Sequence, residues 1–92
     1  MKKLQIQTNL PLSVIKEGNR FIAYTPALDL STSGKTYEEA KKRFNEAVSI
    51  FFEEIIDEGN AEEVLSDLGW TKVQKKWSSP LVVSQESQEI KV

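Results

Sequence analysis

The feature that most constrains the fold of this chain is an amphipathic pattern between Thr36 and Gly59. Apolar residues recur there at intervals of three and four, which is typical of a helix with one buried face. The apolar positions are Tyr37, Ala40, Phe44, Ala47, Val48, Phe51, Phe52 and Ile55. Thr36, with Glu39 three residues later, predicts a capping box in which each side chain satisfies the other residue's backbone N–H. Gly59 predicts the end of the helix, which therefore spans about six turns and needs an apolar partner surface.

The N-terminal third of the chain is expected to supply that surface as antiparallel strands. Residues 4–14 alternate between apolar and polar, which predicts a strand or two collinear strands, with a bend or an edge at Pro11. Gly18 and Asn19 predict a hairpin turn, because both tolerate positive φ. The run at residues 21–25 predicts a central return strand, and residues 28–33 predict a third strand before the helix.

The chain beyond Gly59 predicts smaller elements. Asn60 is expected to cap a short helix that Gly69 ends, and residues 70–77 and 81–83 are expected to form strands. Residues 84–92 are polar with a final alternation, which indicates an edge strand or a flexible tail. The predicted fold is α+β: a three- to four-stranded, mainly antiparallel sheet packed on one long helix, in a single domain over residues 1–92.

The composition excludes several kinds of chemistry. The chain has no cysteine and no histidine, which removes disulfides, thiolate nucleophiles, imidazole bases and the usual zinc or iron ligands. No nucleophile-elbow, Walker or dinucleotide-binding glycine pattern occurs. Asp29 with Glu38 or Glu39 is the one carboxylate pair that an enzyme holding a divalent metal would use, although helix capping explains the two glutamates better. We therefore expect no catalytic, cofactor-binding or metal-binding residues, and no enzyme.

The sequence also bears on location. No apolar run is long enough to cross a membrane, and the start of the chain lacks the apolar centre of a signal peptide. The expectation is a cytoplasmic protein that does not contact membranes.

Charge is unevenly distributed along the chain. The formal net charge is −2, yet residues 1–35 carry five basic and two acidic side chains, and residues 36–58 carry three basic and seven acidic ones. An acidic helix is either a solvated outer face or a docking face for a basic partner. Charge position alone leaves both interpretations open.

Three segments at ordered spacing resemble the HicB family. They are Arg20-Phe-Ile-Ala-Tyr-Thr-Pro-Ala-Leu-Asp-Leu, Gly34-Lys-Thr-Tyr-Glu-Glu-Ala-Lys and Phe44-Asn-Glu-Ala-Val-Ser-Ile-Phe-Phe-Glu-Glu. The family comprises the antitoxins of HicA/HicB toxin–antitoxin pairs and their stand-alone relatives. The similarity covers residues 12–59. Where many relatives have Pro-Gly-Cys, this chain has Asp29-Leu-Ser-Thr, so the turn there is expected to differ.

The resemblance implies a β-β-β-α-β core like a truncated ribonuclease H fold without the catalytic carboxylates. It also implies binding to a small basic HicA-like toxin that cleaves messenger RNA. Many relatives carry a C-terminal DNA-binding module, but residues 70–92 are too short for one, so no separate DNA-binding domain is expected.

These considerations give the expected interaction residues. The residues expected to bind the toxin are Glu38, Glu39, Glu46, Glu53 and Glu54. Ile50 and Ile56 lie on opposite flanks of the apolar stripe, so we expect them to support self-association into a homodimer or a tetramer. The alternative function is nucleic-acid binding through the basic N-terminal region and residues 70–76, where Trp70 and Trp77 either stack on bases or cover the end of a small core.

Overall fold

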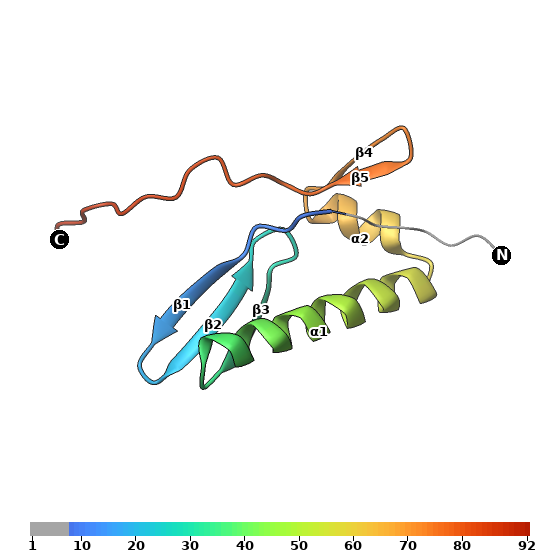
Figure 1. Ribbon diagram of the computed structural model, residues 1–92. Coiled ribbons are helices and arrows are strands. Elements are labelled where there is room, and N and C mark those ends of the chain that lie inside the picture. The colour runs from blue at the N-terminus through green and yellow to red at the C-terminus, as the bar shows by residue number, and fades with distance from the viewer. Residues whose placement is uncertain (1–7) are drawn as a thin grey trace.

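The computed structural model describes residues 8–92, and its architecture is α+β (Figure 1). Strands β1 (Ser13–Glu17), β2 (Arg20–Thr25) and β3 (Leu30–Gly34) form an antiparallel sheet in the order β1-β2-β3, and helix α1 (Tyr37–Asp57) lies across one face of it. Helix α2 (Ala61–Asp67) follows, and then a separate two-stranded hairpin of β4 (Thr71–Val73) and β5 (Lys76–Ser78). The predicted α+β layout is confirmed.

The first strand is shorter than the alternation of residues 4–14 predicts. Gly18, with a φ of 59°, and Asn19 form the predicted turn, so that Glu17 pairs with Arg20 and the register runs back to Ser13. Residues 8–12 are not in a strand, because β2 ends at Thr25 and offers them no partner. Residues 4–7 of the alternation lie outside the described residues.

The third strand also begins later than predicted. It starts at Leu30 instead of residue 28, because Asp29 adopts a positive φ of 48° and turns the chain after β2. Its last residue, Gly34, lies against the start of α1: a Cβ added there would sit 2.6 Å from the Ala40 nitrogen. The Thr32 hydroxyl donates a hydrogen bond to the Ala40 carbonyl oxygen at 3.0 Å. Only a glycine lets sheet and helix meet this closely.

The start of α1 is capped, but the cap differs from the predicted capping box. The Thr36 Oγ1 accepts a hydrogen bond from the Glu39 N–H at 3.0 Å, as predicted. The Glu39 Oε1 accepts from the Lys35 N–H at 2.9 Å instead of the Thr36 N–H, and lies 3.6 Å from the Arg43 Nη2. The pKa of Glu39 is lowered mainly by the hydrogen bond from the Lys35 N–H, and to a smaller extent by the positive charge of Arg43.

Both helices end in the same way. Gly59 (φ 72°) and Gly69 (φ 89°) take the left-handed conformation, as predicted. In each case the N–H groups of the glycine and of the next residue donate hydrogen bonds to carbonyl oxygens in the last turn of the helix, with N···O distances of 2.9–3.1 Å. Asn60 does not cap α2 as predicted, because its side chain makes no capping hydrogen bond. The Asn60 Oδ1 is buried without a partner among the described residues.

The apolar stripe of α1 contributes to two clusters of buried side chains. One joins Ala23 of β2 to Ala40 and Phe44. The other lies at the far end of α1 and consists of Ala27, Leu28, Ile55, Ala61, Leu65, Trp70 and Trp77. Tyr37 departs from the predicted stripe and is 45 % exposed, because it stands at the first helical position.

The two tryptophans close the end of the core. Trp70 is 3 % exposed, and its Nε1 donates to the Ala27 carbonyl oxygen at 2.8 Å. Trp77 is 8 % exposed, and its Nε1 is buried without a partner among the described residues. The core-covering interpretation of both residues is confirmed. The single strand predicted for residues 70–77 is wrong, because Gln74 and Lys75 adopt positive φ values of 51° and 69° and fold the segment into a hairpin.

The last fourteen residues, 79–92, contain no regular secondary structure. The strand predicted for residues 81–83 is therefore wrong, and residues 84–92 do not form an edge strand. The Gln85 Nε2 donates to the Ser13 Oγ at 2.9 Å, beside the start of β1. Beyond that contact the chain runs away from the body of the molecule (Figure 1).

The indole hydrogen bond gives a testable difference between the tryptophans. Trp70→Phe leaves the buried Ala27 carbonyl without its donor, whereas Trp77→Phe removes an N–H that has no partner within residues 8–92. Both variants lose similar volume. We expect Trp70→Phe to lower the free energy of unfolding by about 1–3 kcal/mol more than Trp77→Phe. Urea unfolding followed by circular dichroism measures the difference, and equal losses would contradict it.

The cap at Glu39 predicts a pH dependence of stability. Because its pKa is lower in the folded chain, the stabilisation is present above the ordinary glutamate pKa and is lost as the pH falls through the lowered value. Glu39→Gln should therefore reduce the melting temperature at pH 7, with the difference from the wild type shrinking under acid conditions. The matched control is Glu38→Gln, since Glu38 makes no hydrogen bond or ion pair among residues 8–92. A pH-independent difference at Glu39 would count against this assignment.

Candidate protein-binding surface

The side of α1 turned away from the sheet presents an exposed isoleucine among carboxylates. Ile50 is 55 % exposed. Glu46 precedes it by four residues, and Glu53 and Glu54 follow it by three and four. Side chains at these intervals are neighbours on a helix surface, and all three glutamates are exposed. We call Glu46, Ile50, Glu53 and Glu54 the Ile50 surface.

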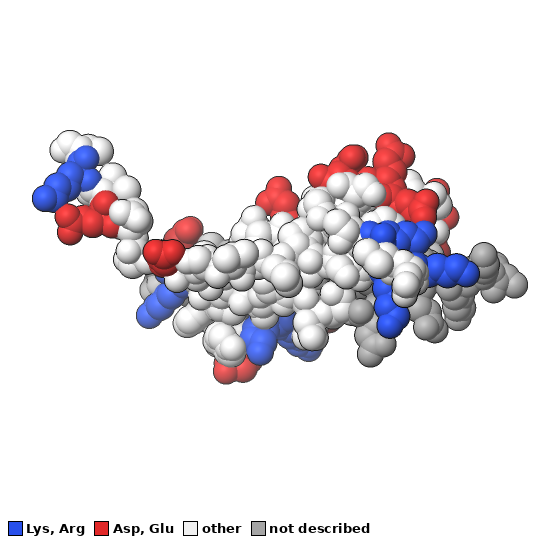
Figure 2. All heavy atoms as spheres, turned by 90° about the horizontal axis from the view of Figure 1, so that it is seen from above, with Lys and Arg blue, Asp and Glu red and all other residues white. Residues whose placement is uncertain are grey.

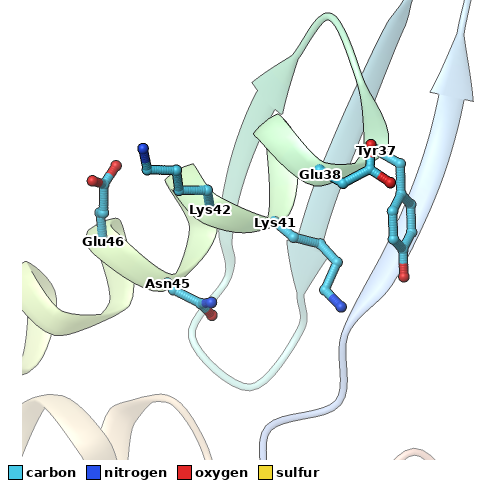
Figure 3. A pocket seen from close by; sticks show the side chains of 6 residues that line it. All are labelled: Tyr37, Glu38, Lys41, Lys42, Asn45 and Glu46. Atoms are coloured by element: carbon cyan, nitrogen blue, oxygen red, sulfur yellow. The ribbon is translucent and has the colours of Figure 1, made fainter.

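The other two predicted toxin-binding residues lie elsewhere on α1. Glu38 and Glu39 stand in its first turn, roughly 24 Å along the axis from Glu54. Glu39 is already engaged by its cap contacts. Glu38 lines an open hollow of mixed charge, together with Tyr37, Lys41, Lys42, Asn45 and Glu46 (Figure 3). Glu46 therefore lies between the two groups, since it lines this hollow with Glu38 and is also a neighbour of Ile50.

The Ile50 surface belongs to a longer acidic region. Residues 44–71 contain eight acidic side chains and no lysine or arginine. One of the eight, Glu62, forms a salt bridge with Lys72, with 2.5 Å between Oε1 and Nζ. This contact lowers the pKa of Glu62. Figure 2 shows carboxylates gathered along one side of the end that carries α2 and the β4–β5 hairpin, with basic side chains beside them.

Helix stability does not account for this placement of charge. The last turn of α1 contains no basic residue, whereas Glu54 and Asp57 stand there and Glu58 is the C-cap. The partial negative charge at a helix C-terminus opposes carboxylates in that turn. These side chains therefore cost local stability, and an interaction outside the helix is one explanation for them.

The two isoleucines expected to support self-association differ in exposure. Ile50 is exposed and Ile56, on the opposite flank of α1, is half-buried. Two copies meeting through Ile50 would bring their surrounding carboxylates together, which like-charge repulsion disfavours. The Ile50 surface therefore fits a basic partner better than a second copy. The spacing of the glutamates around Ile50 was visible in the sequence, but without knowledge of which face the sheet covers it was not distinctive.

The structure does not bring together the carboxylates of the metal-binding alternative. Asp29 precedes β3 and Glu38 and Glu39 follow it, so a five-residue strand of roughly 17 Å separates them. Asp29 instead accepts a hydrogen bond from the Tyr24 hydroxyl at 3.2 Å. Desolvation and then this contact raise the pKa of Tyr24. Within residues 8–92 no group of three or more acidic residues is placed to hold a metal ion.

The two tryptophans and Lys72 of the nucleic-acid alternative are engaged within the fold, while Lys2 and Lys3 of its basic N-terminal region lie outside the described residues. Base stacking needs an exposed aromatic face, and both tryptophans are buried. The Lys72 Nζ contacts Glu62 and lies 5.7 Å from the ring centroid of Trp77. Residues 70–77 therefore expose no aromatic face on which a base could stack.

Two further findings bear on the class of protein. Among the helices of the described part of the chain, none has the length and apolar character needed to cross a membrane. In comparisons with known proteins, the chain matches no protein-family model, no curated protein and no solved structure.

Proposed function

We propose that this chain is a HicB-like antitoxin or a stand-alone relative, which binds a small basic RNA-cleaving toxin of the HicA type and inhibits it by occlusion. It would act as a binding protein in the cytoplasm, where the messenger RNA substrate of such a toxin occurs, and would catalyse no reaction itself. The observation that carries the proposal is the Ile50 surface, an exposed apolar side chain set among three carboxylates.

This arrangement suits a basic protein partner on two grounds. Residues 44–71 contain no lysine or arginine, so the carboxylates of Glu53 and Glu54 attract a positively charged surface and speed the encounter. Ile50 supplies an apolar side chain that loses its exposed area on docking, and a surrounding ring of polar side chains helps to exclude water from such a contact. The three carboxylates alone would suit a solvated outer face, and it is their placement around an exposed isoleucine that favours a docking face.

The elements formed by the HicB-like segments also support the proposal. The first segment forms β2 and the turn into β3, and the second begins at Gly34, where the sheet meets α1. The third forms the part of α1 that contains the Ile50 surface. The spacing of the segments therefore corresponds to one strand–strand–helix unit with the acidic surface on its outer side.

Charge reversal on the Ile50 surface tests the proposal. The assay is a pull-down of the purified chain with the products of small basic reading frames that flank its gene, followed by RNA cleavage by any partner. We expect a partner that cleaves RNA alone and is inhibited by this chain. Glu53→Lys with Glu54→Lys should weaken the complex at least about tenfold, or about 1.4 kcal/mol. Ile50→Ala should weaken it without changing its dependence on salt.

The matched control is Glu63→Lys with Asp67→Lys, which makes the same change in charge on exposed positions of α2. Equal weakening by both pairs would indicate a general charge effect and would contradict a role for the Ile50 surface. The absence of an RNA-cleaving partner among the flanking reading frames would overturn the antitoxin function. Salt-sensitive binding of RNA to the chain alone would support the alternative, a nucleic-acid-binding module without catalytic activity.

A further inference from the structure

The end of the chain leaves apolar side chains without cover. Residues 86–92, which we call the C-terminal arm, follow the contact between Gln85 and Ser13 and project from the body of the molecule (Figure 1). Within the arm, Ile90 is 74 % exposed and Val92 is fully exposed. The two residues are two positions apart, so in an extended strand they lie on the same side. The arm therefore has the apolar pattern of a strand but pairs with none in the described residues.

The same chain has an open strand edge. Among residues 8–92, in the sheet order β1-β2-β3, β1 pairs only with β2. The two-residue turn makes Glu17 and Arg20 the closing hydrogen-bonded pair, so Ile15 and Ser13 also bond to β2. By the same alternation, the N–H groups of Val14 and Lys16 point outward along the open edge.

The side chains of β1 offer an apolar contact beside that edge. Val14 pairs with Ala23 and packs against the cluster beneath α1, so Ile15 lies on the opposite face of the sheet. Ile15 is 52 % exposed. An added strand would set its apolar side chains next to Ile15, and apolar neighbours of this kind stabilise strand pairs.

The arm is placed to reach a second copy. Gln85 is held at the first residue of β1, and the arm then diverges from β1 of its own chain (Figure 1). Seven extended residues span roughly 23 Å, more than the roughly 17 Å of a five-residue strand. A two-fold arrangement satisfies both chains at once, because each copy supplies one arm and one open edge.

We propose that this protein forms a homodimer in which the C-terminal arm of each copy adds a strand to the β1 edge of the other. Ile90 and Val92 pack beside Ile15 of the partner copy, and the outward N–H groups of β1 gain acceptors. The inference is independent of toxin binding, since it uses the sheet edge and leaves the outer side of α1 free.

Light scattering on the full chain tests the dimer, with an expected mass of twice 10.4 kDa. Ile90→Asp with Val92→Asp should give a monomer at concentrations where the wild type is a dimer. Ser84→Asp with Ser87→Asp adds the same charge at one position just before the arm and one within it, removes no apolar side chain, and should leave the dimer intact. A wild type that stays monomeric at high concentration overturns the proposal, as does a dimer unaffected by the first pair.

A backbone variant tests the strand edge separately. Lys16→Pro removes an outward N–H and no hydrogen bond to β2, so it should abolish the dimer while circular dichroism shows a folded chain. Lys16→Ala keeps the N–H and should remain dimeric. Should Lys16→Pro fail to fold, cross-linking decides the question, because the chain has no cysteine of its own. When Lys16→Cys chains are mixed with separately prepared Glu89→Cys chains, a short bis-maleimide should join the two. In a variant that carries both Lys16→Cys and Glu89→Cys, cross-linking confined to one chain would overturn the exchange of arms between copies.

Discussion

The close approach of Gly34 to the first turn of α1 determines how the rest of the molecule is arranged. With its hypothetical Cβ only 2.6 Å from the Ala40 nitrogen, the glycine lets the helix begin directly against the sheet. The Thr32 hydroxyl fixes the same junction by its bond to the Ala40 carbonyl. From that point α1 can run across β2 and β3 with Ala40 and Phe44 buried. The direction of the helix also decides that Ile50 and its neighbouring carboxylates face outward.

The parts of the fold that were predictable from the sequence depend on local interactions. The cap at Thr36, the turn at Gly18 and the glycine ends of both helices involve residues within a few positions of one another. The turn and the glycine ends formed as expected, and so did the Thr36 half of the cap. The bounds of β1 depend on where its partner strand β2 ends. The hairpin between the tryptophans depends on positive φ at Gln74 and Lys75, two residue types that do not indicate such a turn. Periodicity cannot reveal where a neighbouring strand stops, so the alternation of residues 4–14 predicted too long a strand.

The candidate surface was also predictable only where it depends on residues close in sequence. The positions of Glu46, Glu53 and Glu54 around Ile50 follow from helical spacing, but the engagement of Glu39 by Lys35 and Arg43 appears only in the folded chain. The two sides of α1 make opposite contributions. Its inner side contributes buried apolar area, while the carboxylates of its last turn oppose the helix dipole. A helix held firmly by its inner side can tolerate an outer side that is unfavourable for folding.

The turn of the β4–β5 hairpin has a consequence for local opening of the chain. Gln74 and Lys75 both adopt the left-handed conformation, which costs residues with a Cβ about 1–2 kcal/mol each. Strands of three residues form few hydrogen bonds to offset that cost. The burial of Trp77 is therefore the main interaction that holds the hairpin in place. Regions of this kind open without global unfolding. Amide hydrogens of the hairpin should therefore exchange with solvent well before those of β2, and each opening would briefly uncover the end of the core that the tryptophans close.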